Sequence, residues 1–285
     1  MELNNIKKVA VVGAGTMGQG IAQVCAMAGL EVLLYDLNSQ MLDRASQTIS
    51  QNLEKGIERG KVSQEQKEIA LNNIKVTVSE DELLADLIIE AIVEKLDVKQ
   101  GLFKRLEAIN SENTILASNT SSIPITRIAA VLERPANFVG MHFFNPAHIM
   151  KLVEVISGVS TDPQVAQTVY DLALKLGKEP VHAQDAPGFI VNRVARHFYV
   201  EGLKVLEEGV SDVNGIDRLI EYSGFRMGPF RLMDLIGVDT NYSVTESMFN
   251  AFHQDSKFRP SRIQQQKVDA GHHGRKSGKG FYKYD

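Results

Sequence analysis

The sequence predicts an α/β fold in which a mostly parallel sheet domain is followed by an all-helical C-terminal domain. Short apolar runs alternate with helical patterns along the first part of the chain, and the first run ends in a glycine-rich turn. After about Val181 the alternation stops, and the sequence is helical almost throughout. Strands that alternate with helices favour right-handed βαβ units around one mostly parallel sheet.

Six apolar runs are predicted to be strands of this sheet. A parallel strand is usually covered by helices on both faces, so it reads as a continuous apolar run rather than as an alternating one. The six runs are Val9–Val12, Val32–Tyr35, Leu87–Ile89, Thr114–Ala117, Phe138–Met141 and Leu152–Ile156.

Helix boundaries are indicated between and after these runs. A serine with Glu or Gln three residues later has the spacing of a capping box, and an acid directly before a proline begins a helix. The start signals are Ser63 with Gln66, Ser79 with Glu82, and Asp162 with Pro163, and the last of these helices is expected to end at Gly177.

The domain boundary is predicted between Lys178 and Pro187. We therefore expect a sheet domain over residues 1–183 and a helical domain over residues 184–285. Phe189–Glu208 carries apolar residues at helical spacing. The stretch Gly271–Gly280 is expected to be a loop that leads to a short aromatic strand.

The composition excludes several classes of protein. Of 285 residues, 44% are hydrophobic and 23% charged, as in an ordinary globular protein. A formal net charge of −4 gives no general attraction to nucleic acid or to an anionic membrane, so we expect neither as a partner. The single cysteine, Cys25, forms no intrachain disulfide and is expected to be buried. No apolar stretch reaches the roughly 20 residues that span a bilayer, and no targeting segment is recognised, so a cytoplasmic protein is expected.

The glycine-rich segment Gly13–Gly18 follows the first predicted strand and opens a helix that is expected to begin near Gln19. Its G-x-G-x-x-G pattern is typical of a Rossmann-type dinucleotide-binding domain. The first glycine permits a tight turn, the second admits a pyrophosphate, and the third lets helix and strand pack closely. The N-terminus of the helix then faces the phosphates. The predicted cofactor-binding residues here are Gly13, Gly15, Thr16, Met17 and Gly18.

Asp36 ends the second predicted strand, where a carboxylate accepts hydrogen bonds from the adenosine ribose. It would repel a 2′-phosphate, so the sequence favours NAD over NADP as cofactor. Proteins that bind FAD have a similar opening, but they usually carry further nucleotide-binding segments, and we find none.

A histidine and a glutamate form the candidate catalytic pair. His142 lies at the end of an apolar strand, and Glu154 lies inside the next one, where an unpaired carboxylate would be costly to bury. The carboxyl ends of strands are where ligands bind in open α/β sheets. We therefore expect Glu154 to orient His142, which exchanges a proton with an alcohol while NAD exchanges the hydride. The other histidines show no metal-ligand spacing, and this chemistry requires no metal.

Several motifs together resemble one family. They are Gly13–Gly18, Glu90–Glu94, Ser118–Ser122, His142–Pro146, Lys151–Val155, Pro187–Arg193 and Met227–Phe230. In this order the chain resembles the 3-hydroxyacyl-CoA dehydrogenases over essentially its whole length, and most closely the short bacterial form that acts on 3-hydroxybutyryl-CoA.

The resemblance implies a reversible, NAD-dependent oxidation of (S)-3-hydroxybutyryl-CoA to acetoacetyl-CoA by a homodimer. The family's catalytic pair matches His142 and Glu154, and its active-site serine and asparagine match Ser121 and Asn192, which would also contact substrate. The residues that the resemblance adds at the cofactor are Glu94, Lys99, Asn119 and Lys276.

Coenzyme A is expected near a predicted helix in which Asn52, Lys55 and Arg59 share one face. The family's helical hairpin binds coenzyme A there, but with a serine and a lysine where this chain has Asn52 and Arg59. His148, Ile149 and Arg226 also depart from the family pattern and leave the acyl-length preference open.

Two alternatives remain. Enzymes of this fold that act on free β-hydroxy acids usually carry a catalytic lysine where this chain has Asn192-Arg193. A structural or regulatory protein would keep the dinucleotide fold without catalysis, but it would lack a reason to keep the His142–Glu154 pair.

Overall fold

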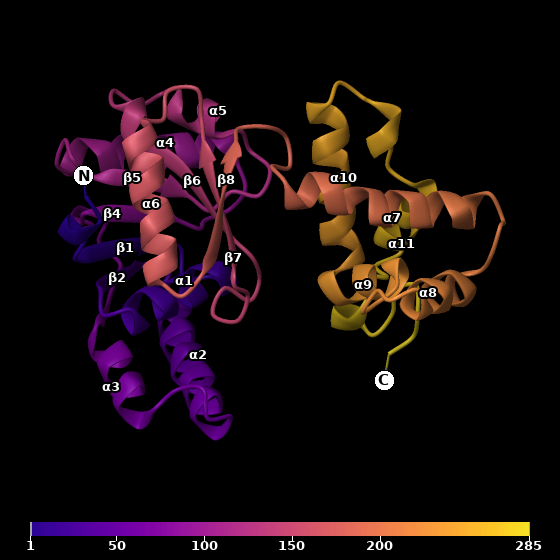
Figure 1. Ribbon diagram of the computed structural model, residues 1–285, viewed down its shortest axis with the longest axis horizontal. Helices are drawn as coiled ribbons and strands as arrows, with labels where there is room; N and C mark the ends of the chain where they lie inside the picture. The colour runs from indigo at the N-terminus through magenta and orange to yellow at the C-terminus, as the bar shows by residue number, and fades with distance from the viewer. Residues whose placement is uncertain (1, 285) are drawn as a thin grey trace. The chain divides into compact units, whose positions relative to one another are not determined.

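The computed structural model describes residues 2–284 and shows two compact units that meet in sequence between Ala186 and Pro187. The larger unit is built on one eight-stranded sheet, and the smaller unit is helical (Figure 1). The strand order is β3-β2-β1-β4-β5-β6-β7-β8, and every neighbouring pair is parallel except β6 with β7. The predicted fold class, a mostly parallel sheet followed by a helical domain, is confirmed.

All six predicted strands are present, and two further strands were missed. The missed strands lie at the two edges of the sheet, where exposed residues interrupt the apolar pattern, and one contains Pro180, a residue typical of edge strands. The strands are β1 Lys8–Val12, β2 Glu31–Tyr35, β3 Ile74–Thr77, β4 Leu87–Glu90, β5 Ile115–Ser118, β6 Phe138–Phe143, β7 Leu152–Ser157 and β8 Glu179–Gln184.

The helices of the larger unit can be compared with the helix starts that the sequence predicted. Ser63 and Gln66 form the predicted capping box, and Asp162 accepts a hydrogen bond from the Gln164 amide. The Ser79 prediction is wrong, because β4 follows so closely that only a 3₁₀ turn forms, with no cap hydrogen bond from Ser79. The helices are α1 Thr16–Met27, α2 Ser39–Glu58, α3 Gln64–Asn72, α4 Leu96–Ile109, α5 Ile125–Ala129 and α6 Pro163–Lys175.

The two faces of the sheet are covered by different helices. Val139 and Met141 of β6 belong to a core that also contains buried residues of α1, α2 and α6. Phe138 faces the other way, where its ring centroid lies 4.7 Å from that of Phe103 in α4. Side chains alternate along a strand, so the side chains of Phe138 and His142 point toward the face that α4 and α5 cover. A Cβ built on Gly140 would meet Ile125 of α5 on the same face.

The smaller unit packs five helices around a core of Tyr199, Leu203, Ile216, Phe230 and Met233. The helices are α7 Val191–Glu207, α8 Val213–Tyr222, α9 Pro229–Ile236, α10 Val238–Ala251 and α11 Arg262–Asp269. Of the helices within residues 2–284, none combines the length and the apolar character that crossing a membrane requires.

The predicted aromatic strand near the C-terminus is absent from residues 279–284, which form only isolated bridges and bends. The reason lies in the hydrogen bonds of this segment. The Phe281 and Tyr282 amides both donate to the Asp234 carboxylate at 2.9 Å. A buried carboxylate of α9 therefore replaces the neighbouring strand that these amides would otherwise need.

Candidate active site

The candidate site lies at the carboxyl edge of the sheet. Strands β1, β4, β5 and β6 run parallel, so their last residues reach the same edge. The glycine turn follows β1, Asn119 follows β5, and His142 lies in the last two residues of β6. The two parts of the predicted site, the glycine turn and the histidine, therefore share the edge at which α/β sheets bind ligands.

The glycine turn fits a dinucleotide. Gly13 has φ +103°, and a Cβ there would lie 2.7 Å from the Ala91 carbonyl oxygen; a Cβ at Gly18 would lie 1.7 Å from the Gly13 carbonyl oxygen. A Cβ at Gly15 would meet nothing within 4 Å, so this glycine borders open space. The helix begins at Thr16, earlier than expected, and its first-turn N–H groups have no intrahelical acceptor. They and the open side of Gly15 suit a pyrophosphate.

Asp36 is fixed at the end of β2 by two backbone amides. Its Oδ2 accepts from the Ala14 amide at 2.9 Å, and its Oδ1 accepts from the Asn38 amide at 3.0 Å. An ionised carboxylate has about four acceptor positions, so capacity remains for ribose hydroxyls. The Asp36 carboxylate thus stabilises the glycine turn and keeps acceptor positions for the ribose that the sequence predicts there.

The structure brings His142 and Glu154 together. They are direct partners in the antiparallel pairing of β6 with β7, so their side chains extend from the same face of the sheet. His142 Nδ1 lies 2.7 Å from Glu154 Oε2, and the residues are 5% and 1% exposed. With Nδ1 directed at the carboxylate, Nε2 is the ring nitrogen that can exchange a proton with a substrate.

Ser121 lies in a turn that is held by Glu94. The Glu94 Oε1 atom accepts from the Ser121 and Ser122 amides at 3.0 and 3.1 Å and from the Thr120 hydroxyl at 2.5 Å. Burial alone would raise the pKa of the Glu94 carboxyl, but the Lys99 ammonium and these hydrogen bonds outweigh burial and lower it. A charged carboxylate therefore anchors the turn, which leads into α5 on the face toward which His142 points.

The Lys99 side chain is completely buried, and its role toward the cofactor remains a prediction. Its Nζ lies 2.5 Å from Glu90 Oε1 and 3.1 Å from Glu94 Oε2. The family resemblance implied a cofactor contact for Lys99, and Glu90 was not predicted as a site residue. The available signal was a carboxylate that directly ends the apolar run Leu87–Ile89.

Asn119 connects two strands beside the histidine. Its Oδ1 accepts from the backbone N–H of Phe143 at 2.8 Å, and the backbone N–H of Asn119 donates to the Glu90 carbonyl oxygen at 2.8 Å. The side chain therefore fixes the backbone next to His142.

The loop after His142 is secured by a second buried lysine, which the sequence did not reveal. Lys178 donates from Nζ to the carbonyl oxygens of Ala147 and Met150, the latter at 2.9 Å, and burial lowers its pKa. A Cβ at Gly20 of α1 would lie 3.1 Å from the Ala147 Cβ. The loop thus lies directly against the helix that begins at the glycine turn.

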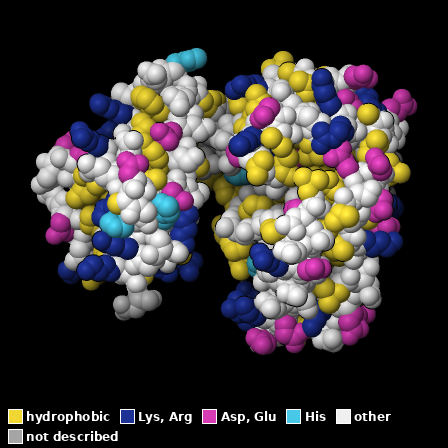
Figure 2. Space-filling model, turned by 180° about the vertical axis from the view of Figure 1, so that it is seen from behind, with side chains coloured by type: hydrophobic (Ala, Val, Ile, Leu, Met, Phe, Trp, Pro, Cys, Tyr) yellow, Lys and Arg dark blue, Asp and Glu magenta, His cyan; other side chains and the backbone are white. Residues whose placement is uncertain are grey.

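The predicted coenzyme A residues lie along α2. Asn52 Nδ2 donates to Gln23 Oε1 of α1 at 3.4 Å, whereas Lys55 and Arg59 are exposed near the end of the helix. Figure 2 shows basic and acidic side chains gathered at the end of the larger unit where α2 finishes and α3 begins. The two cations are therefore available to a phosphate, while Asn52 is partly occupied by a contact to α1.

Two predicted site residues belong to the helical unit. Asn192 lies in the first turn of α7. Lys276 lies in the short turn Arg275–Ser277, where its Nζ is 2.7 Å from the Asp239 carboxylate. The roles of Asn192 and Lys276 toward substrate and cofactor remain predictions.

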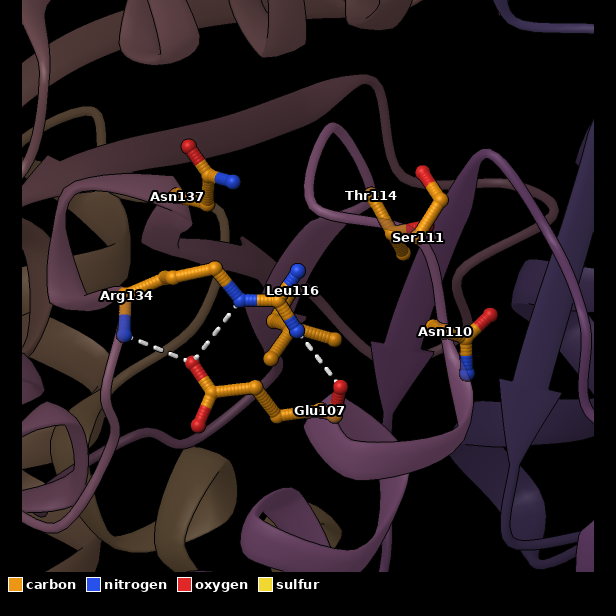
Figure 3. Close-up of a pocket in the computed structure, with 7 residues that line it drawn as sticks. All are labelled: Glu107, Asn110, Ser111, Thr114, Leu116, Arg134 and Asn137. Atoms are coloured by element: carbon orange, nitrogen blue, oxygen red, sulfur yellow. Dashed lines mark hydrogen bonds and ion pairs between the residues drawn. The ribbon is translucent and has the colours of Figure 1, made fainter.

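Other hollows lie away from these residues. A shallow pocket at the amino ends of β5 and β6 is lined by Glu107, Arg134 and neighbours (Figure 3). A cavity of about 320 Å³ in the helical unit is lined by residues of α7 and of the segment that begins α11. Over residues 2–284 we find no group of three or more His, Cys, Asp or Glu side chains arranged for a metal ion.

Two family models match nearly the whole chain. The NAD binding domain of 3-hydroxyacyl-CoA dehydrogenase matches residues 8–186, and the C-terminal domain of 3-hydroxyacyl-CoA dehydrogenase matches residues 188–284.

Individual relatives agree with these models. The 3-hydroxyadipyl-CoA dehydrogenase of Escherichia coli K12 is 48% identical over 98% of this chain, which spans only 59% of that protein. The probable 3-hydroxybutyryl-CoA dehydrogenase of Deinococcus radiodurans is 44% identical over 97% of this chain and 100% of its own length. The crystal structure of (S)-3-hydroxybutyryl-CoA dehydrogenase from Ralstonia eutropha has a TM-score of 0.95 and 41% identity, and the match covers 99% of this chain and 100% of that one. With its NAD-binding sheet domain and its helical domain both matched, the chain belongs to the 3-hydroxyacyl-CoA dehydrogenase family.

Proposed function

We propose that this protein catalyses the reversible, NAD-dependent oxidation of (S)-3-hydroxybutyryl-CoA to acetoacetyl-CoA. The observation that carries the proposal is the buried His142–Glu154 pair, 2.7 Å apart at the same sheet edge as the glycine turn. The family supports the thioester substrate, and relatives at 41–44% identity bear the 3-hydroxybutyryl-CoA dehydrogenase name.

In this reaction the protein itself exchanges a proton with the 3-hydroxyl group of the substrate. A bound nicotinamide supplies or accepts the hydride. In the oxidative direction His142 Nε2 removes the proton of the 3-hydroxyl group, and it returns that proton in the reverse direction. Glu154 holds the ring through Nδ1 and stabilises its protonated form. Such general acid–base catalysis is worth roughly 10²–10⁴-fold in rate.

Further residues are assigned to binding. The glycine turn would hold the pyrophosphate, and Asp36 would hold the ribose and disfavour NADP. Ser121 would donate to the 3-oxygen, and Lys55 and Arg59 would meet the phosphates of coenzyme A. Asn192 and Lys276 would complete the substrate and cofactor sites, and Lys99 would act on the cofactor through Glu94.

The family resemblance also supports a homodimer. Light scattering of the purified protein tests this directly, since a dimer has twice the 31.5 kDa mass of one chain.

A second candidate substrate is 3-hydroxyadipyl-CoA, whose acyl chain ends in a carboxylate. It is favoured by the 48% identity to the Escherichia coli enzyme that bears that name. A ratio of kcat/KM for 3-hydroxyadipyl-CoA over 3-hydroxybutyryl-CoA above one would select this candidate.

The decisive experiment is reduction of acetoacetyl-CoA and of free acetoacetate with NADH and NADPH by the wild type and by His142→Gln. We expect turnover of the thioester with NADH, and a loss of about 10²–10⁴-fold in the variant without weaker NADH binding. Equal turnover of free acetoacetate would favour the β-hydroxy acid alternative. Unchanged turnover by His142→Gln would remove His142 from its role, and no turnover by the wild type would reject the activity.

A further inference from the structure

Glu90 is the most deeply buried acid at the carboxyl edge of the sheet, and neither the sequence nor the proposed chemistry gives it a role. It is the last residue of β4, and its side chain is 0% exposed. An isolated carboxylate is costly to bury, so its partners must compensate the charge.

Three donors surround the Glu90 carboxylate. Oε1 accepts from Lys99 Nζ at 2.5 Å and from the Ile92 amide at 2.7 Å, and Oε2 accepts from the Ser118 hydroxyl at 2.6 Å. These donors come from α4, from the turn after β4 and from the end of β5. Glu90 therefore joins three segments beneath the candidate site.

Two chains of hydrogen bonds lead from Glu90 to the turn that carries Ser121. One passes through Lys99 to Glu94, whose other oxygen accepts from the Ser121 and Ser122 amides. The other passes through Ser118, whose Oγ accepts from the Thr120 amide at 3.2 Å. Both chains end at neighbouring residues of one turn. A substitution of Glu90 would therefore disturb that turn through both chains of hydrogen bonds.

Glu90 also sets the backbone that supports the glycine turn. The Ala91 amide donates to the Val12 carbonyl oxygen at 2.8 Å, and the Ala91 carbonyl oxygen is the atom closest to a Cβ built on Gly13. By accepting from the Ile92 amide, Glu90 fixes the peptide on which the glycine turn rests.

We propose that Glu90 is a positioning residue that holds the Ser121 turn in register with the glycine turn through Lys99, Glu94 and Ser118. This inference rests on the proposed function, because the position of Ser121 matters to catalysis only if Ser121 contacts the substrate. Misplacement of a reacting group by about 1 Å costs up to about 10²-fold in rate.

Glu107 provides a matched control. It is also a buried carboxylate of the larger unit, and it accepts from the Glu133 and Arg134 amides at 2.9 and 2.7 Å. Figure 3 shows it beside Arg134 in the pocket at the amino ends of the strands, the opposite edge from Ser121. Glu107→Gln therefore removes a buried charge of the same kind without touching the Ser121 turn.

The test compares Glu90→Gln with Glu107→Gln in two measurements. In steady-state reduction of acetoacetyl-CoA, we expect Glu90→Gln to lower kcat by about 10- to 100-fold, with KM changed less than about threefold. Glu107→Gln should leave kcat per folded molecule within about twofold. In hydrogen–deuterium exchange of the protein without ligands, the Ser121 and Ser122 amides should exchange at least about tenfold faster in Glu90→Gln only.

A double variant separates positioning from a general effect. If Glu90 acts through Ser121, the loss caused by Glu90→Gln should shrink to within about threefold in the Ser121→Ala background. Additive losses, or unchanged exchange of the two amides, would overturn the proposal. Ser118→Ala removes one of the two chains and replaces Glu90→Gln if that variant does not fold. Failure of the wild type to turn over any 3-hydroxyacyl-CoA would reject the proposed function, while the exchange measurement would still decide the role of Glu90.

Discussion

Buried carboxylates occur in both units of the protein, and they do different things there. At the carboxyl edge of the sheet, Glu154 meets an imidazole that can gain and lose a proton. In the helical unit, Asp234 and Asp217 meet amides and tyrosine hydroxyls that keep their protons near neutral pH. Both arrangements satisfy the buried charge. What distinguishes a candidate catalytic acid is therefore the titratable partner at a ligand-binding edge, and not burial itself.

Substitution of the acid beside the histidine should give the largest effect. Glu154→Gln removes the charge that stabilises the protonated ring and the acceptor that selects its tautomer, so we expect kcat to fall by about 10²–10⁴-fold. NADH binding, followed by fluorescence titration, should stay within about twofold. Normal kcat in this variant would contradict the distinction drawn between the two units.

The matched change in the helical unit is Asp234→Asn. Asp234 holds the Phe281 and Tyr282 amides and the Tyr284 hydroxyl, so the variant should lose about 1–3 kcal/mol of stability in that unit. Thermal unfolding measures this loss. The kcat per folded molecule, counted by active-site titration with NADH, should remain within about threefold of the wild type. A loss of kcat as large as that of Glu154→Gln would contradict the difference proposed between the two carboxylates.

The sequence predicted the structure best at strands that are buried on both faces and at positions where only glycine fits sterically. The six central strands appear as apolar runs. Gly13 and Gly18 are required for steric reasons, because a Cβ at Gly13 would clash with the Ala91 carbonyl oxygen and a Cβ at Gly18 would clash with that of Gly13. The pairing of His142 with Glu154 followed from the cost of burying a lone carboxylate in a strand, and the β6–β7 register shows the two as direct partners.

What the sequence did not reveal are contacts between residues that are distant along the chain. Lys178 reaches the Met150 carbonyl oxygen across 28 positions, and Ser118 reaches Glu90 across the same separation. A lysine or a serine looks alike in sequence whether it faces water or a buried acceptor. Only the strand order brings these partners together, so the network under the Ser121 turn required the fold.

Acid should change the stabilising contributions of Glu94 and Asp217, one residue from each unit, in opposite directions. The pKa of Glu94 is lowered, so its stabilising contribution is present above its unfolded value near 4.5 and is lost as the pH falls through the lower folded pKa. Burial raises the pKa of Asp217 above 3.8, despite hydrogen bonds from Tyr282 and two amides, so its contribution is present below 3.8 and is lost as the pH rises through the higher folded pKa.

The corresponding measurement is the free energy of unfolding of Glu94→Gln and Asp217→Asn, each relative to the wild type, between pH 3 and 7. This pH range includes the unfolded pKa values of both groups, 4.5 for Glu94 and 3.8 for Asp217. The stability deficit of Glu94→Gln should shrink toward acid. The deficit of Asp217→Asn should instead be smaller at neutral pH than in acid. Parallel profiles for the two variants would show that the opposite pKa shifts do not govern acid stability.

The smallest effect should come from the end of α2, where the charges of Lys55 and Arg59 are exposed to solvent. Lys55→Ala and Arg59→Ala should each raise KM for acetoacetyl-CoA by about two- to fivefold with little change in kcat, because exposed ionic contacts contribute about 1 kcal/mol or less. Screening should reduce the difference at high salt. Lys104→Ala, an exposed cation on α4, is the control and should leave KM unchanged. An equal rise in KM for Lys104→Ala would indicate a general charge effect, whereas no rise for either α2 variant would place the coenzyme A phosphates elsewhere.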